Sequence, residues 1–361
     1  MSDKAYKDMV DVMSARGMVF GGMDIPEFYL VAKALFTPEE AEINNAMPQK
    51  TFSAAELAEI MGRDSEELAV TLKQMADKGL CNTYLKGDLR LFRAAPFVPG
   101  IFEFVFMSGT TTDRDKELAK LIKEYKDAWE AKSPIVIPYP MQRVITVDET
   151  IESGNQVHTY NQVKTYIDQN EEIAAAACYC RHAALLRGED THGMPMQTCL
   201  SFGRVAQFTV ECLGAKKLTK EEAYTLLDEC EEAGLIHMTH NVTDGVSYLC
   251  NCDKYHCFAV KIALKQPHPA KVFNSGFEPQ WDKDACTACE TCIDRCPAEA
   301  LVMGDDDVPL VDLNRCFGCA VCATGCPEDA IKMRSKTEAE APPKNNAALM
   351  EAMITAFTSQ D

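Results

Sequence analysis

Positive charge is scarce in this sequence. Its 361 residues contain 36 Lys and Arg against 55 Asp and Glu, which gives a formal net charge of −19. A general nucleic-acid surface needs clustered Lys and Arg to neutralise phosphates, so the charge balance argues against nucleic acid as a partner. An acidic surface instead suits basic protein partners, or serves solubility alone.

Long apolar runs are missing as well. The longest apolar stretches, such as 101–107, are short, and Glu103 interrupts that one, whereas a helical membrane span needs about 20 apolar residues. No charged segment followed by an apolar segment opens the chain, so we expect a cytoplasmic protein without membrane insertion. The sequence contains neither a GxGxxG fingerprint nor a P-loop, so it gives no support to a nicotinamide, flavin or ATP site.

Cysteine, by contrast, is abundant. There are 17 cysteines, and most of them are tightly clustered. Disulfides suit a secreted chain, whereas clustered cysteines in a protein expected in the cytoplasm indicate metal ligation. We therefore expect a reducing, anaerobic environment. Cys81, Cys212 and Cys230 have no partner at motif spacing and are interpreted as core thiols.

Eight cysteines form two copies of one run near the C-terminus. The copies are Cys286-x-x-Cys289-x-x-Cys292-x-x-x-Cys296-Pro297 and Cys316-x-x-Cys319-x-x-Cys322-x-x-x-Cys326-Pro327. In two-cluster bacterial ferredoxins, three close cysteines hold one 4Fe-4S cluster and the fourth ligand comes from the other repeat. This rule predicts two 4Fe-4S clusters, one bound by Cys286, Cys289, Cys292 and Cys326, the other by Cys316, Cys319, Cys322 and Cys296.

The residues after each run also match. AEALV at 298–302 corresponds to EDAIK at 328–332, which predicts a short helical turn and a strand in each half of a pseudo-symmetric ferredoxin fold. Two tetrahedral zinc sites are the alternative, because CxxC pairs alone permit them. The third cysteine on each tight loop and the proline after the fourth favour clusters over zinc.

A further group of cysteines and histidines lies in the middle of the chain, at spacings unlike those of a ferredoxin. The sequence predicts helical stretches that alternate with three cysteine-bearing turns, and separate turns can converge on one centre. Soft thiolates would select a third Fe-S cluster or zinc, with histidine as a further ligand. Scattered buried thiols are the alternative. The members of this candidate third site are Cys178, Cys180, His192, Cys199, Cys250, Cys252, His256 and Cys257.

The segment after residue 50 has the element order of a winged helix. Ser53 to Glu56 predicts a capping box before one short helix, and Asp64 to Glu67 predicts the start of a second helix that ends near Gly79. Strand-like runs at 80–85 and 89–93 flank a turn at 86–88. Because residues 51–95 hold six basic and seven acidic side chains, a structural or docking module is favoured over DNA binding.

We therefore predict an α+β multidomain chain with a winged-helix-like N-terminal region, a mixed helical middle domain and a C-terminal bacterial two-cluster ferredoxin fold. The predicted parts are an N-terminal helical segment at 1–50, the winged-helix-like domain at 51–110, a helix and linker at 111–155, the middle domain at 156–270, the ferredoxin domain at 275–335, and a linker with a tail helix at 336–361.

Besides the ferredoxin runs, several short motifs are spread along the chain. They are FVPGIFE at 97–103, YCRH at 179–182, TCLSFG at 198–203, EA at 222–223, AGLIH at 233–237 and CNC at 250–252. Through these motifs, residues 50–335 resemble a known family, the anaerobic 4Fe-4S dicluster proteins in which a winged-helix-like region and a CxCR-containing middle domain precede a two-cluster ferredoxin. The family usually has cysteine at the positions of His192, Asp253 and His256, so the resemblance implies a middle site with fewer thiolates and histidine ligands, or one without a metal.

Three functions follow from these patterns. The leading one is an electron-transfer protein or subunit that relays single electrons through two 4Fe-4S clusters to a partner redox protein or enzyme complex, with Asp305 to Asp307 suited to a basic partner surface. The second is an oxidoreductase with an additional metal or Fe-S centre in the middle domain. The third is a redox-responsive regulator, which the charge count at 51–95 makes the least favoured.

Overall fold

The computed structural model describes residues 2–17, 20–152, 162–273, 275–337 and 341–358. The chain forms two compact units, each assembled from separate segments. The predicted middle domain is divided between the two units, and its predicted start at residue 156 lies outside the described residues. The first unit comprises 1–135, 176–190 and 204–216, and the second comprises 136–175, 191–203 and 217–361.

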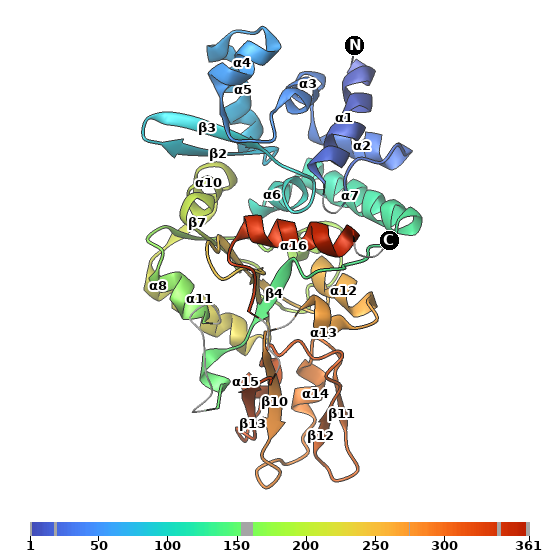
Figure 1. Ribbon diagram of the computed structural model, residues 1–361, viewed down its shortest axis with the longest axis vertical. Helices are drawn as coiled ribbons and strands as arrows, with labels where there is room; N and C mark the ends of the chain where they lie inside the picture. The colour runs from blue at the N-terminus through green and yellow to red at the C-terminus, as the bar shows by residue number, and fades with distance from the viewer. Residues whose placement is uncertain (1, 18–19, 153–161, 274, 338–340, 359–361) are drawn as a thin grey trace. The chain divides into compact units, whose positions relative to one another are not determined.

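The first unit is mainly helical (Figure 1). Its helices are α1 Ser2–Arg16, α2 Pro26–Leu35, α3 Pro38–Ala46, α4 Ala54–Met61, α5 Ser65–Asp77, α6 Ile101–Met107, α7 Asp113–Lys132, α9 Tyr179–Leu186 and α10 Gly203–Leu213. Its strands are β1 Phe52–Ser53, β2 Cys81–Lys86 and β3 Leu89–Ala94, which form one antiparallel sheet in the order β1-β3-β2.

The predicted helix, helix, hairpin order is confirmed in this unit. Ser53 and Glu56 form a reciprocal capping box at α4, and the Asp64 carboxylate caps α5 by accepting the backbone N–H groups of Glu66 and Glu67. Gly87 has a φ of +61°, the left-handed conformation that the tight turn between β2 and β3 requires. The identification of this arrangement as a winged helix stays a prediction.

Aromatic packing forms the core between α2, α6 and α7. The Phe97 and Phe102 rings stack at 4.5 Å, and the Phe28 and Tyr125 rings pack against them edge-on or tilted. Helix α9 packs on α6 and α7, where His182 Nδ1 lies 2.8 Å from a backbone oxygen of α6. This packing explains why 176–190 belongs to the first unit although it is distant in sequence.

The second unit contains a six-stranded sheet and the ferredoxin region. Its strands are β4 Gln142–Ile145, β5 Ile173–Ala176, β6 Cys199–Phe202, β7 Lys216–Leu218, β8 Ile236–His240, β9 Tyr248–Cys252, β10 Phe277–Trp281, β11 Leu301–Met303, β12 Pro309–Val311 and β13 Ile331–Ser335. Its helices are η1 Asp148–Thr150 (3-10), α8 Val163–Asp168, α11 Lys220–Glu232, α12 Phe258–Lys265, α13 Pro269–Val272, α14 Thr291–Arg295, α15 Val321–Thr324 and α16 Asn346–Thr358.

The six-stranded sheet corrects the prediction of a mixed helical middle region with three cysteine-bearing turns. Cys199 begins β6, and Cys250 and Cys252 lie within β9, so two of the three predicted turns are strands. The strand order is β4-β8-β9-β6-β5-β7. These strands are only three to five residues long, and the alanine-rich β5 lacks the β-branched enrichment that identifies a strand from sequence.

The two faces of this sheet bury different partners. Ile145, Leu200 and Leu249 face a core that includes residues of α8 and α11. Their sequence neighbours point to the opposite face, because side chains alternate along a strand. On that face Val144 belongs to a core that includes residues of α12 and the ferredoxin region.

The tail forms the predicted helix, α16. Leu349 and Met353 are buried against Val242, and the segment before the helix is held by a hydrogen bond from the Thr243 N–H to the Pro343 carbonyl. Within the described ranges, no helix is long and apolar enough to cross a membrane.

We predict an acid-sensitive contribution to stability from His240 at the end of β8. Its ring packs 4.2 Å from the Tyr248 ring, and burial lowers its pKa to about 4. Since an unfolded histidine titrates near 6.5, this contribution is full above that pH and is lost as pH falls toward 4. Anaerobic urea unfolding measures the free energy of unfolding at pH 7.5 and at pH 5.5. The decrease between the two pH values should be smaller in His240→Gln than in the wild type by about 1 kcal/mol, after allowance for partial exposure of the ring.

The exposed histidine His268 provides the control. His268→Gln should leave the difference between the two pH values as it is in the wild type. An equal effect of both substitutions would contradict the assignment to His240.

Candidate iron-sulfur centres

The two cysteine runs fold into loops with the same backbone pattern. Ala288 and Glu290 in the first loop have φ values of 54° and 61°, and Gly318 and Ala320, thirty positions later, have 72° and 69°. Left-handed residues that alternate with right-handed ones turn successive backbone N–H groups to one side and create a concave site for anions. A short helix follows each loop, α14 in the first repeat and α15 in the second.

Strand pairing between the two repeats places the fourth cysteine of each run beside the loop of the other run. β10 pairs antiparallel with β13, with Phe277 opposite Ser335 and Trp281 opposite Ile331. β11 and β12 form the second pair, and α14 contacts α15. Each half therefore has the expected short helix and following strand, while both strand pairs form between the halves.

The first pocket has a volume of about 340 Å³, part of which is open to solvent. Trp281 and Pro309 contribute to its wall. Its cysteines are Cys286, Cys289 and Cys292 from the first run and Cys326 from the second.

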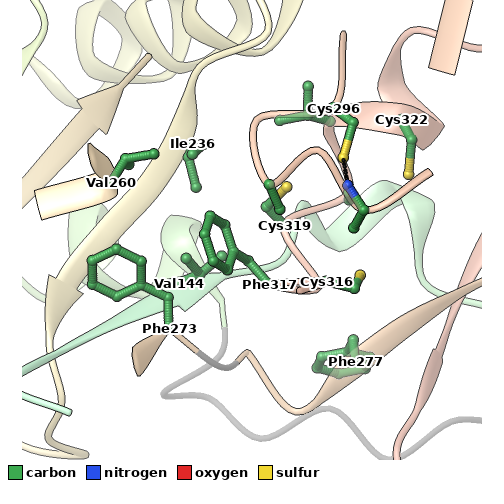
Figure 2. Close-up of a cluster of buried hydrophobic side chains, with 14 of the residues drawn as sticks. Val144, Ile236, Val260, Phe273, Phe277, Cys296, Cys316, Phe317, Cys319 and Cys322 are labelled. Carbon is green, nitrogen blue, oxygen red and sulfur yellow. Dashed lines mark hydrogen bonds between the residues drawn. The ribbon is translucent and has the colours of Figure 1, made fainter. Parts of the chain in front are cut away.

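The second pocket has a volume of about 320 Å³, part of which is open to solvent, and Phe317 and Met333 contribute to its wall. Figure 2 shows its four cysteines together on one side of Phe317, with Val144 and Ile236 of the sheet on the other side. The four are Cys316, Cys319 and Cys322 from the second run and Cys296 from the first.

The two pockets differ in exposure. Cys289 in the first pocket is exposed, and hydrogen bonds from the Thr291 hydroxyl and backbone N–H lower its thiol pKa. All four cysteines of the second pocket are buried. Burial raises the pKa of Cys316 to about 11 and raises that of Cys322 further, because a thiolate loses hydration there.

The second cysteine loop is fixed by hydroxyl groups. Thr146 Oγ1 and Ser275 Oγ each donate to the Gly318 carbonyl at 2.7 Å. At the fourth cysteine, the Ala300 N–H points to the Cys296 sulfur at 3.4 Å, the dashed line in Figure 2. No local pattern identifies Thr146 from the sequence, because it lies 172 positions from Gly318.

Arg295 is a second residue near the centres that the motif did not single out. Its guanidinium donates to the carbonyls of Glu231 and Glu232 in the last turn of α11, while Nε donates to the Val321 carbonyl beside the second pocket. A cation at a helix C-terminus is favourable. Its charge also lies close enough to act on the Cys322 thiol.

The donor sets of the two pockets fit 4Fe-4S clusters. Each pocket combines four thiols with a largely apolar wall. Backbone N–H groups of the loops bond to cysteine sulfurs such as those of Cys289 and Cys316, which suits a thiolate-bound cluster. In the described ranges, no three His, Cys, Asp or Glu side chains are placed to bind a single metal ion together. Cubane ligands need not do so, because each of the four thiolates binds a different iron.

The comparison with known families agrees with this chemistry. Residues 285–331 match the family described as the 4Fe-4S dicluster domain, while no curated protein matches the chain. The chain therefore contains an iron-sulfur, metal-binding domain of the ferredoxin class. More particularly, this segment is similar to 4Fe-4S dicluster domains, whose function class is iron-sulfur electron transfer.

The predicted third constellation is divided between the two units. Cys178 precedes α9 and Cys180 lies within it, both in the first unit. The other six members belong to the second unit. They are Cys199 in β6, Cys250 and Cys252 in β9, Cys257 immediately before α12, and the loop residues His192 and His256.

The two histidines of this group make contacts of their own. The His192 ring stacks on Tyr255 with centroids 4.1 Å apart. His256 Nδ1 lies 3.1 Å from Asp253 Oδ1, and the same carboxylate oxygen accepts the backbone N–H groups of Tyr255 and His256. Asp253 thereby fixes the turn between β9 and α12.

The first unit contains a partly buried titratable group, Glu103, whose environment no sequence motif indicated. The Glu103 carboxylate accepts the Gly100 N–H at 2.6 Å, and both residues belong to the FVPGIFE motif. Burial raises the pKa of Glu103 to about 7, against the opposing effect of Lys126. The signal was present as a single charge within an apolar run.

We predict that Gly318→Ala removes about half of the bound iron. A Cβ at this position would lie 2.2 Å from the Phe277 carbonyl oxygen and 2.3 Å from Ser275 Oγ, on a backbone with φ of +72°. The loop would have to shift, which disturbs the second pocket that Gly318 lines. Iron analysis of anaerobically purified protein measures the loss.

Gly62→Ala is the matched control, because Gly62 has a φ of +64° with nothing within 4 Å of the added Cβ. It should keep its iron and lose about 1 kcal/mol of stability from backbone strain alone. Full iron retention in Gly318→Ala would show that the loop tolerates the Cβ and is not held as described.

Proposed function

We propose that the chain is an electron-transfer protein or subunit that relays single electrons through two 4Fe-4S clusters to a partner redox enzyme. The observation that carries the proposal is the pair of four-cysteine pockets within one small domain. A bound cluster supplies one-electron chemistry, and the protein tunes it through hydrogen bonds, charge and solvent exposure. Reductive titration of the anaerobic protein tests this, with two electrons per chain expected and none contradicting it.

The proposed ligand sets are the crossed ones, in which each run lends its last cysteine to the other cluster. The membership of the two pockets supports this assignment. The sets are Cys286, Cys289, Cys292 and Cys326 for the first cluster, and Cys316, Cys319, Cys322 and Cys296 for the second.

The β11–β12 hairpin is the proposed docking surface for the partner. Val302 and Leu310 are opposite each other in this hairpin, and they are 62% and 58% exposed. The turn between them carries Asp305, Asp306 and Asp307, and Pro309 lines the first pocket. An apolar contact rimmed by acidic groups suits a partner with a basic rim, which would approach the more exposed cluster.

We predict that pairs of cysteine substitutions identify the ligand sets. Cys286→Ala/Cys326→Ala should damage one cluster and leave about four irons, whereas Cys286→Ala/Cys296→Ala should damage both. If each run instead kept its own fourth cysteine, the two results would be exchanged. Iron content and EPR of the anaerobic, folded variants distinguish the two cases.

We predict that the acidic turn accelerates electron transfer to a basic acceptor, with cytochrome c as the probe. Removing the charges of Asp305, Asp306 and Asp307 by substitution with Asn should lower the second-order rate constant several-fold at low ionic strength. The difference should vanish in high salt, because exposed charges are then screened. Stopped-flow absorbance measures the rate.

The control removes three exposed acidic charges in the first unit, with Glu42→Gln, Glu59→Gln and Glu117→Gln. This variant loses the same net charge. An equal decrease in both variants would attribute the effect to net charge and contradict a docking role for the hairpin.

A further inference from the structure

Three thiols of the middle region share one face of the six-stranded sheet. β6 and β9 pair antiparallel, with Leu200 opposite Leu249, so Cys199 lies opposite Cys250. Leu200 and Leu249 point into the core with α8 and α11. Because side chains alternate, Cys199, Cys250 and Cys252 point to the other face.

The pairing geometry brings two of these thiols especially close. The Phe202 N–H donates to the Ser247 carbonyl at 2.9 Å, and these two residues are opposite each other in the same register. Hydrogen-bonded and non-hydrogen-bonded pairs alternate in an antiparallel ladder, which makes Cys199 and Cys250 a non-hydrogen-bonded pair. Such pairs have Cα atoms about 4.5 Å apart and the closer side chains.

The thiols are neighbours in the structure as well. The Cys250 thiol lies near enough to those of Cys199, Cys252 and Cys257 for their charges to act on one another. Cys252 and Cys257 are 8% and 5% exposed. Both belong to the continuous buried core that contains the cysteines of the second pocket.

We propose that Cys199, Cys250, Cys252 and Cys257 form a four-thiolate site for one zinc ion, separate from the two cluster pockets. Thiolates favour zinc or Fe-S clusters over hard cations. A tetrahedral zinc ion with Zn–S bonds of about 2.3 Å needs sulfur atoms about 3.8 Å apart. The close Cys199–Cys250 pair across the two strands matches this spacing better than that of a cubane, whose ligands bind four different irons.

The proposed site contains only four of the eight residues in the constellation predicted from the sequence. Asp253 and His256 are engaged with each other and with the backbone of their turn, so they shape the approach of Cys257 to β9. Because no three ligands in the described ranges already converge as ligands of one ion, binding requires the thiols to turn about χ1. Each thiol releases its proton when it binds the metal.

Such a centre would tie together β6, β9 and the start of α12. The zinc centre would stabilise the contact between the sheet and the buried core that the sheet shares with the ferredoxin region. The inference goes beyond electron transfer and does not depend on it, since zinc does not change its oxidation state.

The test measures zinc and iron on the full chain purified anaerobically, for the wild type, Cys199→Ser, Cys250→Ser and Cys230→Ser. Cys230 is a fully buried thiol in α11 of the same unit and serves as the matched control. We expect about one zinc per chain in the wild type and in Cys230→Ser, at least a several-fold decrease in the other two variants, and unchanged iron in all four.

A second measurement on the wild type does not depend on folding of a variant. Cys199 and Cys250 should resist alkylation in the zinc-loaded protein and become modified after chelation, as mapped by mass spectrometry. Three outcomes would each overturn the zinc assignment. They are absence of zinc with both thiols reactive, a Cys199–Cys250 disulfide, and extra iron that the Cys250→Ser substitution removes. Because iron is counted separately, failure of the zinc site would leave the two-cluster proposal standing.

Discussion

The ferredoxin region depends on one constraint: four soft thiols must line each candidate centre, while one tight loop supplies only three. The antiparallel pairing of β10 with β13 answers this constraint, because it joins the strand before the first run to the strand after the second. Each loop then lies beside the last cysteine of the other run. The left-handed residues in both loops follow from the same need, since only such turns wrap successive cysteines and N–H groups around one centre.

The sequence predicted the ferredoxin region well because its signals are local. The spacing of Cys286, Cys289 and Cys292 specifies a loop, and the thirty-residue repeat specifies the fold. The N-terminal helices and the hairpin were predicted for the same reason, through the caps at Ser53 and Asp64. The contacts that hold the second loop, from Thr146 and Ser275, are long-range or lie outside the motif, and no local pattern announces them.

The middle region shows where local signals fail. CNC at 250–252 was interpreted as a turn, but it lies in β9, where its cysteines share one face and face Cys199 of β6. Short strands in a sheet buried on both faces are specified by pairing with distant segments, not by their own alternation. The helix α9, which carries Cys178 and Cys180, packs in the first unit for a similar reason, through contacts with α6 and α7.

In the second pocket, burial disfavours the negative charge that a cluster gains on reduction, whereas nearby positive side chains favour it. A cluster gains a negative charge on reduction, and a buried site disfavours that charge because hydration is lost. Arg295 and Lys336 provide compensating positive charge near Cys322 and Cys316 respectively. In the first pocket, solvent and the Thr291 hydroxyl at Cys289 compensate negative charge. The pseudo-symmetric loops thus sit in unequal environments, and the difference arises from the sheet and helix α11, which the second repeat contacts and the motif does not encode.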